Sequence, residues 1–290
     1  MHLMHMFQMH SVSCKQHKSD ICYKGFNVYK IYIETHSLTN LIIKGIKMNK
    51  KIILSSFASL LFLSQAANAE IKVGQGSLTF NASVASQYIA RGVDQNKDSV
   101  TPSVGADLTY PAGGFNLYIG AWVSGSDYNT GAGGQERDVY LGVNKTFGIT
   151  TLDLGYITYT YPGVVTASKE ANNAEYYIKL TLAPEKKPYT FGAAYYQDDT
   201  GGVKNTSNNN RKFDRDYYEV NATYDFGPVQ SFVSYGVFDN DTKTTTVSLS
   251  KELAGVGFTL SYINAEKEDA NLSQLNKNRD YVTLSAKKTF

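Results

Sequence analysis

Apolar and polar residues alternate from Ser77 to Phe290 in about twelve short segments. In the clearest segment, every second residue from Val104 to Tyr110 is apolar, and the residues between them are Gly, Asp and Thr. Because successive side chains of a strand point to opposite faces, this period predicts strands with one apolar and one polar face. The same period recurs in residues 115–123, 139–143, 176–182 and 218–226.

The connectors between these segments are alternately tight and long. The tight ones are Pro111–Gly114, Gly148–Ile149, Pro184–Pro188, Gly227–Pro228 and Ala254–Gly257. The long ones are rich in Gly, Asn, Asp and Ser, and they are Val93–Val100, Gly125–Gln135, Gly163–Asn173, Asp199–Asp214, Asn240–Lys243 and Lys267–Asn278. This order gathers every tight turn at one end of the sheet, as in outer-membrane barrels.

We therefore predict an all-β fold, a closed antiparallel transmembrane β-barrel of about 12 strands of the outer-membrane type. A soluble β-sandwich is the alternative because its strands also alternate, but its Greek-key crossings give no reason to segregate the connectors. The absence of any run of about 20 apolar residues excludes a helical membrane protein. The 22 Tyr suit the aromatic girdles of a barrel, although Tyr also favours strands in general.

Residues 48–69 have the three parts of a bacterial secretory signal peptide. Lys50 and Lys51 form its positive end, Ile52–Leu63 its apolar stretch, and Ala67–Ala69 its small-residue cleavage site. We predict cleavage between Ala69 and Glu70, so that the barrel occupies residues 70–290. We interpret residues 1–47 as a disordered, non-native upstream extension; a genuine long extension is the alternative.

Charge and cysteine content change when only the predicted mature chain is counted. Eight of the 28 Lys and Arg and two of the 26 Asp and Glu precede Glu70, which leaves 20 basic and 24 acidic side chains and a net charge of about −4. The mildly acidic chain gives no indication of a nucleic-acid partner. Both Cys lie before residue 48, so we expect no disulfides and a fold stabilised by its strand ladder.

The segment Ser86–Gln95 reads Ser-Gln-Tyr-Ile-Ala-Arg-Gly-Val-Asp-Gln. It resembles the Ser-Asp-Tyr-x-x-Arg-Gly-x-Ser-Gln start of the TorF family of proteobacterial porins, also known as Gcw_chp proteins of unknown function, and departs from it at Gln87 and Asp94. Further matches follow at Tyr118, Gly120, Trp122, Ser124, Asp127, Glu136, Asp138, Tyr140, Gly142, Tyr159, Tyr161, Pro162, Gly163, Glu175, Tyr176 and Tyr177. The resemblance implies an outer-membrane location and a pore, without a known substrate.

Catalytic chemistry has few candidate residues in the predicted mature chain. All five His and both Cys precede residue 48, so Ser-His and Cys-His nucleophiles and the commonest metal ligands are missing. Carboxylate pairs of the glycosidase kind remain, such as Glu136 with Asp138 or Asp198 with Asp199. Solvated acidic residues are ordinary at strand ends, so we expect no enzyme, no cofactor and no metal.

The face opposite the regular apolar one lines the interior of the predicted barrel. Two interpretations stay open: a narrow channel that binds small polar solutes or favours cations, or a barrel filled by its own rings. Arg91 is expected to pair with an inner carboxylate, because an unpaired charge in a dry lumen is costly. The predicted pore-lining residues are Arg91, Asp107, Tyr118, Trp122, Asp138, Tyr140, Asp153, Tyr159, Tyr161, Glu175, Tyr177, Lys179 and Glu219; Tyr196 shares their face.

The last segment ends on Phe290, and a C-terminal aromatic residue is the usual assembly signal of bacterial barrels. We therefore expect the barrel-assembly machinery, periplasmic chaperones, outer-membrane lipid with lipopolysaccharide, and small solutes as partners. The predicted function is a porin or narrow channel in the cell outer membrane for passive diffusion of small polar or cationic solutes. The alternative is a non-conducting structural or adhesive barrel whose loops bind an external partner.

Overall fold

The structure is a computed structural model that describes residues 70–126, 134–166, 169–199, 203–204, 212–213, 216–239, 242–266 and 279–290. The predicted extension at residues 1–47, the signal peptide at 48–69 and most of the predicted long loops after residue 198 lie outside the described residues. No helix in the described part of the chain is long and apolar enough to cross a membrane.

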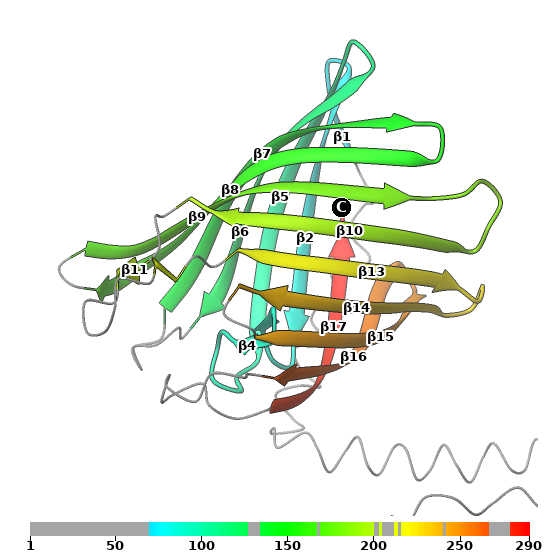
Figure 1. The fold of residues 1–290 in the computed structure, drawn as a ribbon. Helices are drawn as coiled ribbons and strands as arrows, with labels where there is room; N and C mark the ends of the chain where they lie inside the picture. Colours follow the sequence, from blue (N-terminus) through cyan, green and yellow to red (C-terminus); the bar gives the residue numbers. More distant parts are fainter. Residues whose placement is uncertain are drawn as a thin grey trace, which may run out of the picture. The chain divides into compact units, whose positions relative to one another are not determined.

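Twelve antiparallel strands form one closed barrel wall (Figure 1), as the sequence predicted. In chain order they are β2 (Gly76–Ala85), β5 (Thr101–Ala112), β6 (Phe115–Ser126), β7 (Gly134–Phe147), β8 (Thr150–Thr166), β9 (Lys169–Leu182), β10 (Tyr189–Asp198), β13 (Tyr217–Asp225), β14 (Gln230–Phe238), β15 (Lys243–Leu253), β16 (Val256–Glu266) and β17 (Arg279–Thr289). The short strands β1 (Ile71–Val73), β3 (Ile89–Ala90), β4 (Val93–Asp94), β11 (Val203–Lys204) and β12 (Lys212–Phe213) accompany them.

The barrel closes where β2 pairs with β17. Their register runs from Ser285 opposite Ala85 to Thr289 opposite Asn81, and the backbone N–H of Phe290 donates to the Phe80 carbonyl over 2.7 Å. The first residues of β2, which β17 does not reach, pair instead with β1, with Val73 opposite Gly76. The closing strand is thus hydrogen-bonded on both sides, as a strand in lipid requires.

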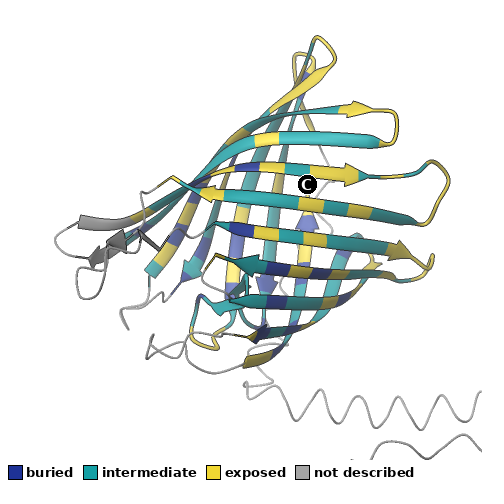
Figure 2. Ribbon diagram, viewed as in Figure 1, coloured by how far each residue is buried: buried dark blue, intermediate teal, exposed yellow. Residues whose placement is uncertain are grey.

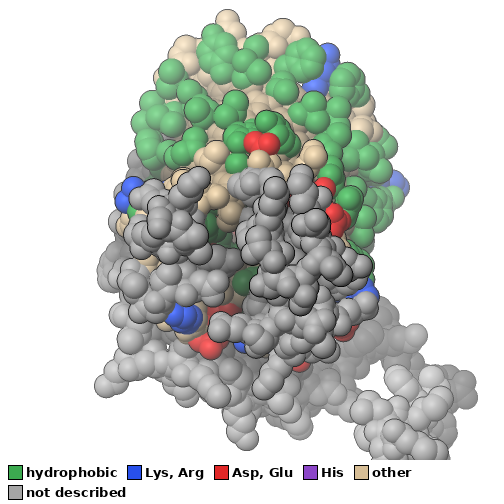
Figure 3. All heavy atoms as spheres, turned by 60° about the vertical axis from the view of Figure 1, so that its left-hand side comes forward, with side chains coloured by type: hydrophobic (Ala, Val, Ile, Leu, Met, Phe, Trp, Pro, Cys, Tyr) green, Lys and Arg blue, Asp and Glu red, His purple; other side chains and the backbone are tan. Residues whose placement is uncertain are grey.

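Exposed and less exposed residues alternate along each strand (Figure 2), and large apolar side chains make up much of the visible outer wall (Figure 3). Leu141 on β7 is 52% exposed and Val220 on β13 is 58% exposed, although both lie mid-strand. Such side chains are suited to hydrocarbon, because a strand in lipid presents its apolar face to the bilayer. The outward faces are the ones that the sequence period assigned.

Tight turns join the strands at one end of the barrel, which we call the turn end; the opposite edge is the loop end. The link between β5 and β6 has two residues, Gly113 and Gly114, with φ of +59° and +84°. Positive φ at both central positions is the geometry of the tight hairpin turn that matches the strand twist, and glycine adopts it without strain.

Two sequence-based boundaries were wrong. The region Gly163–Asn173, predicted as a long loop, instead extends β8 and β9, which pair as far as Thr166 opposite Lys169. A register irregularity between Tyr161 and Val165 accommodates Pro162 and Gly163, so their composition marks a bulge rather than a loop. The predicted connector Val93–Val100 starts too late, because the first barrel strand, β2, ends at Ala85 and the longer connector to β5 carries its own small hairpin, β3–β4.

Candidate functional site

A hairpin from the connector between β2 and β5 lies inside the barrel at the loop end. Its strands β3 and β4 pair Ile89 with Asp94 and Ala90 with Val93, which leaves Arg91 and Gly92 as a two-residue turn. Both turn residues have positive φ, +47° for Arg91 and +79° for Gly92. This backbone is costly for a residue with a side chain, so the tip is held by contacts elsewhere.

Apolar contacts dock the hairpin on the inner wall of β16 and β17. Ile89 packs against the buried side chains of Ile263, Ala265 and Tyr281. Gly92 lies so close to the wall that a Cβ there would be 2.8 Å from the Ala265 Cβ. The hairpin is therefore packed onto one side of the lumen and not suspended in it.

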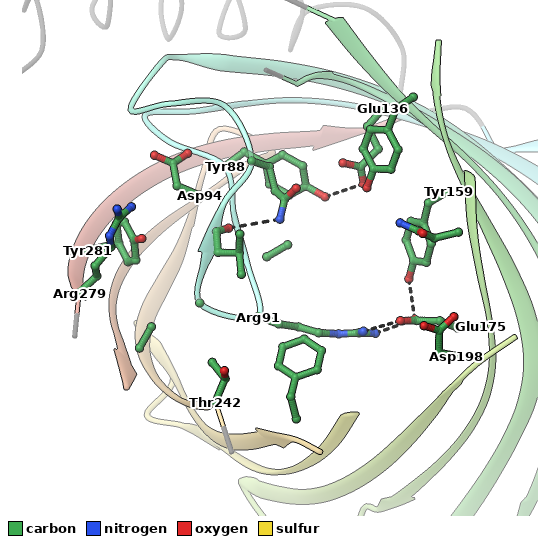
Figure 4. Close-up of a pocket in the computed structure, with 18 of the residues that line it drawn as sticks. Tyr88, Arg91, Asp94, Glu136, Tyr159, Glu175, Asp198, Thr242, Arg279 and Tyr281 are labelled. Carbon is green, nitrogen blue, oxygen red and sulfur yellow. Dashed lines mark hydrogen bonds and ion pairs between the residues drawn. The ribbon is translucent and has the colours of Figure 1, made fainter. Parts of the chain in front are cut away.

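From the hairpin tip, Arg91 reaches across the lumen to Glu175 on β9 (Figure 4). Its two terminal nitrogens donate to the two carboxylate oxygens of Glu175 over 2.6 and 2.9 Å, and the Tyr159 hydroxyl donates to the same carboxylate over 3.0 Å. The guanidinium also lies over the Tyr196 and Tyr217 rings, 4.2 and 4.6 Å from their centroids. A bidentate pair stacked on aromatic rings is the arrangement in which Arg is least replaceable by Lys.

The hairpin's Tyr88 forms a third anchor, on β6 and β7. The Tyr88 hydroxyl donates to Oε1 of Glu136 over 3.0 Å, and its ring meets the Trp122 ring edge-on with centroids 5.5 Å apart. Burial, followed by the negative charges of Glu136 and Asp138, raises the pKa of the Tyr88 phenol above its ordinary value. The hydroxyl therefore stays protonated and remains a donor.

Below the hairpin, tyrosines on β6 and β7 donate to inner carboxylates, and a tyrosine on β9 joins them through its hydroxyl. The Tyr118 hydroxyl donates to Asp153 over 2.6 Å and lies 2.7 Å from the Tyr177 hydroxyl. The Tyr140 hydroxyl donates to Asp107. This network holds the rings in fixed positions on the inner wall, because each phenol is tied to a strand two or three places away in the sheet.

Glycines on adjacent strands make room for these rings. A Cβ on Gly120 would lie 2.3 Å from the Tyr140 ring, one on Gly142 would lie 2.3 Å from the Tyr118 hydroxyl, and one on Gly155 would lie 2.3 Å from the Tyr177 ring. Each ring therefore covers the bare backbone opposite it, a pairing that stabilises glycine in sheets. A ring that lies flat on the wall occupies less of the lumen than one that projects into it.

A cavity of about 370 Å³ opens beside the hairpin at the loop end. Its lining combines aromatic rings with more acidic than basic groups: Tyr88, Tyr159, Tyr161, Tyr281, Phe238, Asp94, Glu136, Glu175, Asp198, Glu266, Arg91 and Arg279. Because Arg91 is committed to Glu175, the rest of the lining has excess negative charge. In the described part of the chain, no group of three or more His, Cys, Asp and Glu side chains could hold a metal ion.

Most of the predicted lining residues belong either to the contacts around Arg91 and Glu175 or to the network of tyrosines and carboxylates below the hairpin. Asp138 lies directly across from Trp122 on β6 and from Tyr159 on β8, and Lys179 lies across from Asp153. Glu219 on β13 accepts hydrogen bonds from Asn221 over 3.2 Å and from the Tyr217 hydroxyl over 3.3 Å. Of the predicted terminal signals, Ala69 is outside the described residues, Glu70 is exposed, and Phe290 pairs with Phe80.

Sequence reasoning missed the inner hairpin and, with it, the roles of Tyr88 and Glu136. A signal was present: Arg91 and Gly92 stand between two short segments that begin with a β-branched residue, Ile89-Ala90 and Val93-Asp94, and two residues with Gly between strand segments indicate a hairpin. Tyr217, which stacks on Arg91, was also missed, although it shares the inward parity of Glu219 two residues along the same strand.

Fold and site together define a closed, twelve-stranded barrel of the outer-membrane type with a hairpin docked in its lumen. The chain belongs to a family described as "Bacterial protein of unknown function (Gcw_chp)", whose model matches residues 72–290. No curated protein matches the chain.

Solved structures similar to this chain are themselves barrels of the outer membrane. A KdgM porin is 12% identical over 73% of this chain and 99% of its own, with a TM-score of 0.48. A NanC porin is 9% identical over 71% and 98%, also with a TM-score of 0.48. Outer membrane phospholipase A from Escherichia coli is 13% identical over 73% and 90%, with a TM-score of 0.42. At such identities and scores, these likenesses carry no argument about function.

Proposed function

We propose that this protein is a channel of the bacterial outer membrane through which small polar or cationic solutes diffuse passively. The proposed lining comprises the predicted inner residues together with Tyr88, Glu136 and Tyr217. Secretion through cleavage after Ala69, assembly through Phe290, contact with lipid and lipopolysaccharide, and the narrower kinship with TorF porins belong to the same proposal.

One observation carries the proposal: charged side chains face the lumen without ion pairs. Asp153, Lys179 and Glu219 are only partly buried, and none of them forms a salt bridge within the described residues. In a dry lumen such charges would be strongly destabilising, whereas water in a channel solvates them. Ser250 on β15, a small side chain on the inner face that is only partly buried, occupies little of the lumen.

The second candidate function is a non-conducting barrel that binds a partner through its loops. The hairpin favours it, because Ile89 packs on β16 and β17 while Arg91 and Tyr88 bond to β9 and β7 on the other side, which places chain across the lumen. The two functions differ in whether ions pass beside the docked hairpin.

Cysteine labelling of single channels tests the choice. In a Cys14→Ser, Cys22→Ser background, Ser250→Cys places the sole thiol on the inner face, and Leu249→Cys places it on the outer face, where Leu249 is 49% exposed. In planar bilayers, a bulky charged thiol reagent should reduce the current through the Ser250→Cys protein and leave the Leu249→Cys protein unchanged. Folded protein without single-channel current would contradict the channel and favour the second candidate.

A further inference from the structure

Two neighbouring carboxylates on β7, Glu136 and Asp138, are the most deeply buried acidic groups of the inner wall near the hairpin. Glu136 is 2% exposed and Asp138 is 7% exposed. Because they are two residues apart on one strand, both side chains lie on its inner face, and Asp138 is about 7 Å farther from the loop end than Glu136. Neither forms an ion pair within the described part of the chain.

Each carboxylate has one oxygen without a hydrogen-bond partner among the described residues. These oxygens are Oε2 of Glu136 and Oδ1 of Asp138. Glu136 receives the Tyr88 hydroxyl on its other oxygen, and the Tyr161 hydroxyl approaches the same carboxylate. Two adjacent buried carboxylates with unused acceptors are strongly unfavourable unless a proton, a cation or further donors reach them.

Aromatic rings surround this acidic pair. Tyr88, Tyr159 and Tyr161 line the cavity together with Glu136, and Trp122 stands directly across from Asp138. Ring faces attract cations, and the attraction grows when the cation is desolvated. The 370 Å³ cavity lies within the size range of small-molecule sites.

From these features we infer that the loop-end cavity is a binding site for a small organic cation with a primary ammonium group, which Glu136 holds among the rings, while Asp138, outside the cavity lining, adds negative charge deeper along the wall. The unused oxygen of Glu136 can accept from an N–H donor, which a primary ammonium has and a quaternary ammonium lacks. The inference deepens the proposed channel function by assigning a solute class to its mouth. Binding can be measured without current, so the two proposals can fail separately.

Trp122 provides a native reporter, because it is the chain's single Trp and touches Tyr88 beside the site. The full chain, purified from outer membranes in detergent, is titrated at pH 7 with butylamine, which is protonated there like a lysine side chain. Trp122 emission should change saturably with butylamine and not with the neutral analogue butanol. Isothermal titration calorimetry gives the same affinity independently.

Two Glu→Gln variants test whether binding depends on Glu136 itself or only on the negative charge of the protein as a whole. Glu136→Gln should weaken butylamine binding by roughly tenfold or more, since a charge-assisted hydrogen bond is lost. Glu185→Gln removes a carboxylate in an exposed tight turn at the turn end, outside the cavity lining, and should bind as the parent does. Equal binding by Glu136→Gln, no saturable response in the parent, or equal affinity for butanol or tetramethylammonium would overturn the inference. Protein that binds butylamine without conducting would support the site and contradict only the channel.

Discussion

Arg91 and Glu175 are 84 residues apart in the chain and form a bidentate ion pair across the barrel lumen, with contacts of 2.6 and 2.9 Å. Arg91 stands at the tip of the inner hairpin, in a backbone conformation that costs free energy, and Glu175 belongs to the wall strand β9. The pair therefore fixes the hairpin's position and neutralises one of the acidic groups of the loop-end cavity.

Removing one partner of this pair should destabilise the barrel. Arg91→Met leaves Glu175 charged and largely buried, so we expect the free energy of unfolding to fall by roughly 3 to 5 kcal/mol, measured by reversible urea unfolding in lipid. Adding Glu175→Gln should recover part of that loss, because the orphaned charge is gone. If the two substitutions are simply additive, the pair does not act as a unit.

The lipid-facing wall should be sensitive to charge at mid-strand. Leu141→Arg should lower the free energy of unfolding by roughly 2 to 4 kcal/mol if Leu141 lies near the bilayer midplane, because its exposed side chain meets hydrocarbon. Asn144 lies three residues along the same strand on the inner face, where Asn116 donates to it over 3.0 Å. Asn144→Arg should therefore fold with little loss. Equal losses for both variants in lipid would contradict the assignment of the two faces.

The faces, the strand number and the tight turns could be predicted because each depends on a period of two and on short turn signals. Leu141 outside and Tyr140 inside follow directly from alternation. The partner of Arg91 could not be predicted, since Glu175 is one of several inner carboxylates and their angular positions depend on strand register and shear. The extension of β8 past Pro162 was missed because a bulge and a loop share the same residue types.

Glycines beneath the inner tyrosines should resist even a methyl group. Gly120→Ala would press on the Tyr140 ring, which is hydrogen-bonded to Asp107 and cannot move without breaking that bond. Overpacking of this kind costs roughly 1 to 3 kcal/mol, which urea unfolding in lipid can measure. Gly257→Ala is the matched control, since its Cβ would meet only the Lys287 carbonyl at 3.8 Å. A control as destabilised as Gly120→Ala would mean that loss of glycine, and not ring contact, sets the effect.

Ion selectivity should respond in opposite directions to two charges that face each other across β8 and β9. Asp153 and Lys179 are register partners and both face the lumen, partly buried. In reversal-potential measurements across a salt gradient, Asp153→Asn should lower the preference for cations and Lys179→Met should raise it, because charges in a narrow passage bias the permeating ion. Lys187→Met, in an exposed tight turn, is the control and should leave selectivity unchanged. The shifts should shrink at 1 M salt, where screening acts within about 3 Å. Shifts of the same sign in both inner variants would show that neither side chain lies along the ion path.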